Sequence, residues 1–422
     1  MKSLNMLTIL LPFILMTSSC DLLKIDDKSN ESKDFVRREL PRALDISEKQ
    51  LIDGSTRFGI ELMQQIAGID PESNHFISPL SIVLAAGMLL NGAEGETYEQ
   101  IQEMLGLDGM DQQEINEAGQ SLIELLAGFD NKVVFNIANS VWYRNTFEVE
   151  TDFLQANQYY FDALVQKVDF NDPATVDLIN EWVEDKTEGL INEIVQDIDP
   201  LVMMFLINAI YFNGEWTLQF DPDLTDKKPF FLSDGTESEV DMMRLEDAEN
   251  LEYATGENWQ AVNLYYGDAG FAMTLVLPDE NISLYEWFRE MDLEIWSAFT
   301  RRFINVTLDL EMPKFELEYE VDLNDLLEEM GMVDAFYPDR SDFSRINSDY
   351  EDLHVSDVLH KSFVRVDEEG TEAAAVTSIG FRATSVPQRV HIRFDRPYFY
   401  VIREVESNTP LFMGMMSNPA GE

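Results

Sequence analysis

The side chains best able to do chemistry are few and widely spaced in this sequence. It holds one cysteine and four histidines, His75, His354, His360 and His391. Zinc sites of the usual kind need cysteines or histidines at short, repeated spacings, and the sequence has no such spacing and no His-Glu-x-x-His. It also lacks a Gly-x-Ser-x-Gly nucleophile motif and a glycine-rich nucleotide loop. We therefore expect no metal, no cofactor and no enzymatic activity.

One segment has residue types suited to a change of backbone state rather than to catalysis. Residues 368–377 read EEGTEAAAVT, so the small residues Thr371, Ala373 and Ala375 occupy alternate positions. Because neighbouring side chains of a strand point to opposite faces, one face of this segment would carry only small groups. Alanine is a weak strand former in isolation, which suits a segment that passes from loop to strand. Taken alone, the segment is more typical of an ordinary loop rich in small residues.

Cys20 lies at the end of a secretion-type leader. Met1-Lys2 is followed by an apolar run over residues 4–16, which is too short to remain as a membrane-spanning helix, and then by small residues. This stretch resembles a bacterial lipoprotein signal in which Cys20 becomes the lipidated amino terminus. The family pattern usually has a larger aliphatic residue where Thr17 stands, so an ordinary secretory signal is the alternative. Either signal predicts an extracytoplasmic protein, secreted or bound to the cell envelope.

The charge balance excludes whole classes of partner. The chain of 422 residues has 80 Asp+Glu against 29 Lys+Arg, for a formal net charge of -51. A protein this acidic repels nucleic-acid phosphates and anionic lipid headgroups. We expect no nucleic-acid partner and no membrane contact other than a lipid anchor.

The order of predicted elements indicates a single large α+β domain. Residues 21–46 are polar and predict a flexible tether, and residues 47–422 have a globular composition. We expect a helix from about Ser55, a second that is capped by Ser78-Pro79 and buried on all sides, and a third that is opened by a capping box at Thr97. Two further helices are predicted at 176–187 and 323–330, and strands at 133–143, 203–212, 271–277 and 304–310. Without βαβ alternation, this order favours antiparallel or mixed sheets.

Four blocks, in the right order and spacing, resemble the serpin family over roughly residues 47–419. They are NAIYFNGEW at 208–216, EEGTEAAAVT at 368–377, FDRPY at 394–398, and LFMG at 411–414 with the closing Asn418-Pro419. The resemblance implies the serpin fold, with helices packed around three β-sheets and a mobile reactive-centre loop over about residues 368–393. It also implies a monomer. We therefore interpret the chain as a bacterial serpin of the lipoprotein type, with Cys20 as the lipidated residue.

The resemblance implies an irreversible suicide inhibitor of serine proteases, with cysteine proteases as a second class. A protease cuts the loop, and the cut loop inserts into the central sheet as a new strand while the acyl-enzyme is still intact. New ladder hydrogen bonds and side-chain burial would drive insertion by on the order of 10–20 kcal/mol. A non-inhibitory binding or chaperone-like serpin is the alternative. The acidic stretch 111–130 has no Lys or Arg, so we expect no glycosaminoglycan partner.

Family spacing, counted from Glu368, puts the cleaved bond at Thr384–Ser385. A small β-branched residue there favours elastase-like or subtilisin-like proteases. Cleavage after Arg382, which would indicate a trypsin-like target, and cleavage after Ala383 or Val386 remain alternatives.

The resemblance also assigns roles to residues that control insertion. The hinge residues are Glu368, Gly370, Thr371, Ala373, Ala374 and Ala375. The polar shutter beneath the sheet would comprise Ser78, Ser81, Asn208 and His360, with side-chain hydrogen bonds that hold two strands together. Trp216 would cap the point at which insertion begins, and Lys314 would pair with Glu368.

Overall fold

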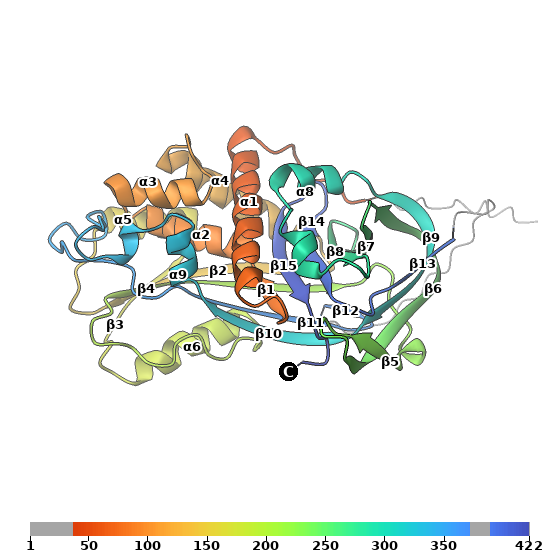
Figure 1. Cartoon of the computed structure of the whole chain (residues 1–422). Coiled ribbons are helices and arrows are strands. Elements are labelled where there is room, and N and C mark those ends of the chain that lie inside the picture. The colour runs from red at the N-terminus through yellow and green to blue at the C-terminus, as the bar shows by residue number, and fades with distance from the viewer. Residues whose placement is uncertain (1–36, 372–388, 422) are drawn as a thin grey trace, which may run out of the picture. The chain divides into compact units, whose positions relative to one another are not determined.

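The chain folds into helices packed on mixed β-sheets, which confirms the predicted α+β class. The computed structural model describes residues 37–371 and 389–421, and these residues form three sheets (Figure 1). Over the described part of the chain, no helix is both long enough and apolar enough to cross a membrane.

Most of the larger helices precede the first long strand of the chain or closely follow it. The nine described α-helices are α1 (Ile46–Ile69), α2 (Pro79–Leu90), α3 (Gly95–Met104), α4 (Gln112–Leu126), α5 (Thr151–Tyr160), α6 (Ala174–Lys186), α7 (Leu284–Phe288), α8 (Leu293–Phe299) and α9 (Asn324–Glu329). Two short 3₁₀ turns, Pro222–Leu224 and Asp334–Phe336, complete the helical elements of this part.

The first helix begins earlier than the sequence pattern predicts. It starts at Ile46 rather than near Ser55, because Asp45 and Glu48 form a capping box at its amino end. The residues before it also differ from the predicted tether to residue 46. Arg42 forms an ion pair with Glu48, whose side chain is fully buried, and the Leu40 amide donates to the Glu406 carboxylate. The segment from Arg37 onward therefore lies against the folded body.

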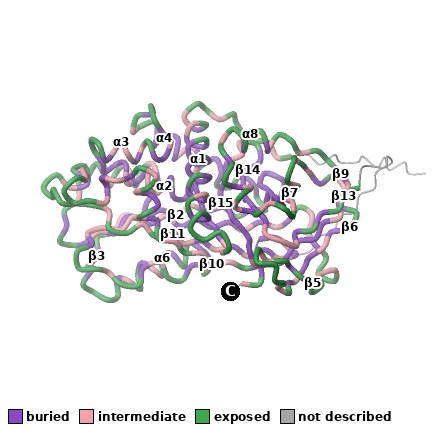
Figure 2. The backbone as a smooth tube through the Cα atoms, viewed as in Figure 1, coloured by how far each residue is buried: buried purple, intermediate pink, exposed green. Residues whose placement is uncertain are grey.

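The largest sheet contains nine strands and forms much of the core. Its strands are β1 (His75–Ile77), β5 (Asp226–Phe231), β6 (Glu237–Thr255), β7 (Trp259–Tyr266), β8 (Phe271–Pro278), β9 (Ile304–Pro313), β13 (Arg389–Arg393), β14 (Tyr398–Glu404) and β15 (Pro410–Met416). Every residue of β8, β14 and β15 is buried, which explains their nearly continuous apolar sequences. Figure 2 shows this burial along the centre of the body.

The two smaller sheets are the ones that concern function. One has the order β12 (Gly370–Thr371), β4 (Met204–Glu215), β2 (Val133–Arg144) and β3 (Leu164–Val168), and the other pairs β10 (Phe315–Asp322) with β11 (Leu359–Val366). Among the described residues no backbone ladder joins β4 to β11. The short strand β12 pairs with β4 and also contacts β11. We call the boundary between β4 and β11, which β12 enters at one end, the seam.

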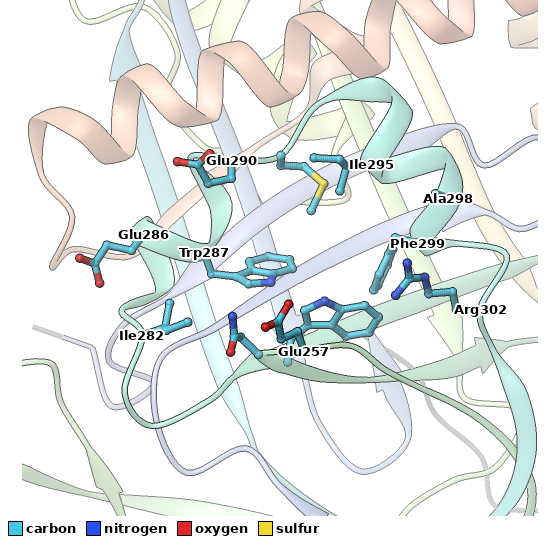
Figure 3. A pocket seen from close by; sticks show the side chains of 12 residues that line it. Glu257, Ile282, Glu286, Trp287, Glu290, Ile295, Ala298, Phe299 and Arg302 are labelled. Atoms are coloured by element: carbon cyan, nitrogen blue, oxygen red, sulfur yellow. The ribbon is translucent and has the colours of Figure 1, made fainter.

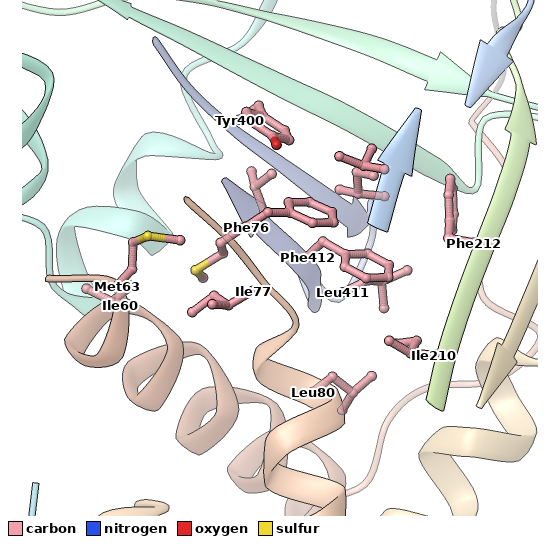
Figure 4. Close-up of a cluster of buried hydrophobic side chains, with 14 of the residues drawn as sticks. Ile60, Met63, Phe76, Ile77, Leu80, Ile210, Phe212, Tyr400, Leu411 and Phe412 are labelled. Carbon is pink, nitrogen blue, oxygen red and sulfur yellow. The ribbon is translucent and has the colours of Figure 1, made fainter. Parts of the chain in front are cut away.

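Helix α2 supports the seam from the core side. Its capping prediction is confirmed, because the Ser78 side chain accepts from the Ser81 amide and Pro79 occupies the first turn. Most of its residues are buried, as its apolar sequence predicts. Figure 4 shows Leu80 at the start of α2 among the core side chains, together with Ile210 of β4 and the stacked rings of Phe76 and Phe412.

Candidate functional site

A tight turn carries the chain from β11 into the seam. The Asp367 carboxylate accepts from the amides of Glu369, at 3.0 Å, and Gly370, at 3.2 Å, while the Asp367 amide donates to the Gly370 carbonyl at 2.9 Å. At Gly370 a side chain has no room, because a Cβ atom would lie 2.1 Å from the carbonyl oxygen of Gly214. The turn therefore requires glycine at this point, where the chain runs directly against β4.

Two hinge residues already form a strand. Gly370 pairs with Glu215 and Thr371 pairs with Gly214, antiparallel to β4. The Thr371 side chain is buried, and its hydroxyl lies 2.8 Å from the hydroxyl of Tyr266. Burial raises the pKa of Tyr266 well above its ordinary value, so this contact is between neutral groups. The hinge therefore enters the seam by two residues in the uncut chain.

Trp216 fixes the turn from the side of β4. Its indole stacks on Tyr266, with ring centroids 4.3 Å apart and an interplanar angle of 16°. Its ring nitrogen donates to the Asp367 carbonyl at 2.9 Å, and its backbone amide donates to the Glu369 carbonyl at 2.8 Å. One buried side chain thus joins the end of β4, the core and the hinge turn.

A partly buried ion pair anchors the start of the hinge. The Lys314 ammonium donates to Glu368 at 2.8 Å, and the Thr225 hydroxyl donates to the other carboxylate oxygen, also at 2.8 Å. Burial alone would raise the pKa of Glu368, but these two hydrogen bonds outweigh it and hold the pKa below its usual value. The hydrogen bond to Glu368 in turn raises the pKa of Lys314.

The first half of the shutter ties β11 to α2. The Ser78 amide donates to Nε2 of His360 at 3.1 Å, and the Ser78 hydroxyl donates to the Leu411 carbonyl at 2.7 Å. Burial lowers the pKa of His360 to about 4, so the ring is neutral at pH 7 and can accept the amide proton.

The second half ties β4 to the same helix. The Ser81 hydroxyl donates to the Asn208 side chain, which donates to Oδ1 of Asn139 at 2.6 Å. Asn139 on β2 then donates to the Phe161 carbonyl at 2.8 Å. The predicted shutter residues therefore lie together. Their hydrogen bonds connect β4 and β11 through α2, because each strand is tied separately to the first turn of this helix.

The far end of the predicted loop is a regular strand. Residues 389–393 form β13 in parallel register with β9, so the loop is shorter than the predicted span of 368–393. Arg389 makes two hydrogen bonds to Asp309, at 2.9 and 3.0 Å, and Arg393 makes two to Glu311, at 2.7 and 3.1 Å. Both arginines anchor the chain where it leaves the loop.

Several predicted site residues lie outside the described residues. They are the hinge alanines Ala373, Ala374 and Ala375, the bond candidates Arg382, Ala383, Thr384, Ser385 and Val386, and the lipidation candidate Cys20.

Four residues that contribute to the site were not predicted from the sequence. Asp367, Thr225, Tyr266 and Asn139 contact the hinge or the shutter. The aspartate directly before Glu-Glu-Gly is a turn signal that the sequence carries. The other three meet their partners across long separations in the chain, and no local pattern marks them.

Chemically, the site offers a place for an additional strand rather than a catalytic centre. In the described parts of the chain, no group of three or more histidine, cysteine or carboxylate side chains could hold a metal ion. The distinctive feature is the edge of β4 from residue 204 to residue 213, which has backbone groups facing the seam beyond the two residues paired with β12.

Comparisons with known proteins agree over nearly the whole length. A family model described as serpin (serine protease inhibitor) matches residues 53–419. Mouse neuroserpin is 31% identical over 379 residues, which covers 86% of this chain and 90% of that protein.

Solved structures of serpins also match this chain over most of its length. The thermophilic serpin tengpin in its native state aligns with a TM-score of 0.80 at 34% identity, over 91% of this chain and 97% of that one. In its latent state tengpin aligns with a TM-score of 0.76. Human thyroxine-binding globulin in complex with its ligand also aligns at 0.80, with 28% identity over 89% of this chain and all of that one.

Proposed function

The chain belongs to the serpin family, and from this membership we propose that it is an irreversible suicide inhibitor of serine proteases, with cysteine proteases as a second target class. The observation that carries the proposal is the pairing of Gly370 and Thr371 with β4, at one end of a seam that no backbone ladder bridges within the described residues. Because Gly370 and Thr371 already pair with β4, the residues after them could extend the same strand along the edge of β4. The small alternate residues after Thr371 suit the same face of an inserted strand.

The inhibitory reaction begins as ordinary proteolysis. The hydroxyl of the protease's serine attacks the carbonyl carbon of the bait bond, the peptide C–N bond breaks, and the leaving nitrogen takes a proton to become a new amino terminus. The first half of the loop is then joined to the protease as an ester. Freed from the anchor at β13, this half inserts along β4 and carries the protease with it.

Insertion stops the reaction at the ester. Each ladder hydrogen bond gained contributes about 1 kcal/mol net, so pairing along the remaining ten positions of β4 favours insertion by on the order of 10 kcal/mol. Displacement of the oxyanion donors or the general base by about 1 Å slows hydrolysis of the ester by orders of magnitude. The uncut state is therefore a kinetic trap.

We assign the bait bond to Thr384–Ser385 and the target to an elastase-like or subtilisin-like protease. The leader that ends at Cys20 supports an extracytoplasmic location, with a lipid on Cys20. A Cys20→Ser variant should then leave the detergent phase in a phase-partition assay, and if both forms partition alike the lipid anchor is wrong.

The decisive experiment mixes the protein with elastase, subtilisin, trypsin and chymotrypsin separately. We expect a complex stable to boiling in detergent with elastase or subtilisin, together with a released fragment whose mass corresponds to residues 385–422. Cleavage by every enzyme without such a complex would rule out inhibition. That outcome would favour the alternative of a binding protein, for which the structural likeness to thyroxine-binding globulin is the supporting observation.

A further inference from the structure

A pocket of about 410 Å³ opens between the start of β7 and the helices α7 and α8, away from the hinge and the shutter. Its walls include two tryptophans, Trp259 and Trp287, together with Phe299 and Met291. Both indoles are only partly buried, so their remaining surface faces the cavity. Figure 3 shows Trp287 and Phe299 at the pocket, with Glu257 below Trp287 and Arg302 beyond Phe299.

The two indoles are held in place by the body of the protein. At Gly256 a Cβ atom would lie 2.3 Å from the ring nitrogen of Trp259, so the ring lies directly against this glycine. Trp259 also meets Phe299 edge to face, with centroids 4.9 Å apart. Trp287 packs on Phe399 of β14 at 6.0 Å. A ligand would therefore meet aromatic walls that are already ordered before it binds.

The charges around the pocket are not equivalent. The Glu286 carboxylate accepts from the amide and hydroxyl of Ser283 in the cap of α7, and Glu290 pairs with Arg289 at 3.0 Å. Glu257, by contrast, has no hydrogen bond or ion pair within the described residues, and its side chain is exposed at the pocket. Arg302 also lines the pocket, and its side chain has no partner within the described residues. The pocket thus combines aromatic faces with one uncommitted carboxylate and one uncommitted guanidinium.

We propose that this pocket binds a small organic cation through an alkylated ammonium group, such as the trimethylammonium head of choline. Indole faces carry negative electrostatic potential and attract cations, most strongly where water is excluded. Methyl groups on the nitrogen fit apolar walls, and such a head needs no hydrogen-bond acceptor, only a nearby negative charge, which Glu257 supplies. The net charge of -51 further raises the local concentration of cations. This proposal does not depend on protease inhibition.

Calorimetric titration with choline and with 3,3-dimethylbutan-1-ol tests the proposal, because the alcohol has the same shape without the charge. We expect choline to bind at least tenfold more tightly than the alcohol. Equal affinities, or no binding of either compound, would overturn the proposal.

Variants of single residues locate the site. Trp287→Leu should weaken choline binding about 5- to 30-fold, and Glu257→Gln should weaken it about 3- to 10-fold. Arg302→Gln should strengthen it about twofold, because Arg302 places a like charge at the pocket. The matched control is Glu294→Gln, an exposed residue of α8 that does not line the pocket, and it should bind choline as the unmodified chain does. If Glu294→Gln weakens binding as much as Glu257→Gln, the general negative field rather than the pocket binds the cation, and the proposal fails.

The same head group occurs in free metabolites and in lipids. Flotation of the Cys20→Ser variant, which cannot carry the proposed lipid, with phosphatidylcholine vesicles separates the two sources. Choline binding without flotation supports a free ligand. Flotation that choline competes away assigns the lipid headgroup to the same pocket. Flotation that choline leaves unchanged, in a chain that does not bind free choline, contradicts the proposal.

Discussion

Burial in the shutter keeps the His360 ring neutral. His360 is buried beneath the seam and accepts a hydrogen bond from the Ser78 amide, which only the neutral ring can do. Its hydrogen-bond partner lies at the amino end of α2, where a proton on the ring would meet a backbone donor instead of an acceptor. Protonation is therefore disfavoured both by burial and by the loss of this bond.

The first prediction concerns acid stability. The unfolded chain takes up a proton at His360 near pH 6.5, but the folded chain does so only near pH 4. Acid therefore favours the unfolded state. The contribution of His360 to the free energy of unfolding should fall between pH 6.5 and pH 4, by at most about 3 kcal/mol, and stay constant below pH 4. Urea denaturation over pH 4–8 measures the change, and His360→Gln should flatten the curve.

His75 is a second contributor to the same curve, because burial also lowers its pKa. Some slope should therefore remain in the His360→Gln variant. His354→Gln, at an exposed position, is the matched control for the substitution itself, and its free energy of unfolding at pH 7 should equal that of the unmodified chain. A His360→Gln curve as steep as the unmodified one would show that the shutter histidine is not responsible.

The second prediction concerns the Lys314–Glu368 pair. Lys314→Met leaves the partly buried Glu368 with only the Thr225 hydroxyl, so native stability at pH 7 should fall by about 1 kcal/mol, a small value because the Lys314 side chain is 44% exposed. The pair holds the pKa of Glu368 low, so its contribution is present above about pH 4.5 and is lost in more acid solution. A double-mutant cycle with Glu368→Gln, followed by urea denaturation at pH 7 and in acid, gives the coupling. A coupling that is zero at pH 7 would show that the pair does not anchor the hinge.

At the scale of elements, side-chain hydrogen bonds tie both β4 and β11 to helix α2, whereas no backbone ladder within the described residues joins the two strands to each other. Strand β4 is tied through Asn208 and Ser81, and β11 through His360 and Ser78, to one turn of α2. No ladder within the described residues joins the two strands. A strand could therefore enter between them without breaking backbone pairs, and only the side-chain ties to α2 would have to adjust.

The third prediction uses the position of Thr371 in this arrangement. Thr371→Arg would place a charged side chain against Tyr266 in a buried site, so insertion should stall and the protein should become a substrate. Electrophoresis in detergent after mixing with the target protease should show mostly cleaved chain instead of complex.

The control for this experiment is Tyr266→Phe, which removes the hydroxyl partner but adds no charge. It should cost about 1 kcal/mol of stability and still form the complex. If Thr371→Arg forms as much complex as the unmodified chain, the hinge does not insert along β4.

The sequence predicts regular elements well where one local pattern decides them. The strands expected at 133–143, 203–212, 271–277 and 304–310 correspond to β2, β4, β8 and β9, with ends within a few residues. Prediction fails where a side chain that could cap a helix locally binds a residue distant in the sequence instead. Thr97 does not cap α3, because the helix begins at Gly95 and the Thr97 hydroxyl accepts from the Asp342 amide. Helix α4 is not among the predicted helices, although Asp111 and Glu114 carry its capping box.

The site, too, has residues that could be located from the sequence and contacts that could not. The resemblance locates Trp216, Glu368 and the four shutter residues, and these meet in the structure. Whether the hinge is already paired, and which strand it pairs with, depends on Tyr266 and Gly214, whose roles follow only from tertiary packing. Spacing along the sequence cannot supply this information.

At the scale of the whole molecule, the loop is held at both ends by the body. One end is fixed by β12, Trp216 and Lys314, and the other by β13 through Arg389 and Arg393. As long as the chain between them is intact, the β13 anchor opposes deeper insertion at the seam. On the proposed mechanism, cleavage would remove that opposition. The energy released on insertion would then measure the stability that the uncut fold withholds.

The last prediction follows from this. Nicking the loop with a protease that is then removed should raise the melting temperature by tens of degrees, because about ten ladder bonds and the burial of the inserted strand add on the order of 10 kcal/mol to the folded state. Calorimetry on intact and nicked protein measures the difference. Nicked Thr371→Arg should melt close to its intact form, since its hinge cannot enter, and this separates insertion from any other effect of cleavage. Equal melting temperatures for the nicked and intact unmodified chain would mean that the seam stores no such energy, and the inhibitory mechanism would have no driving force.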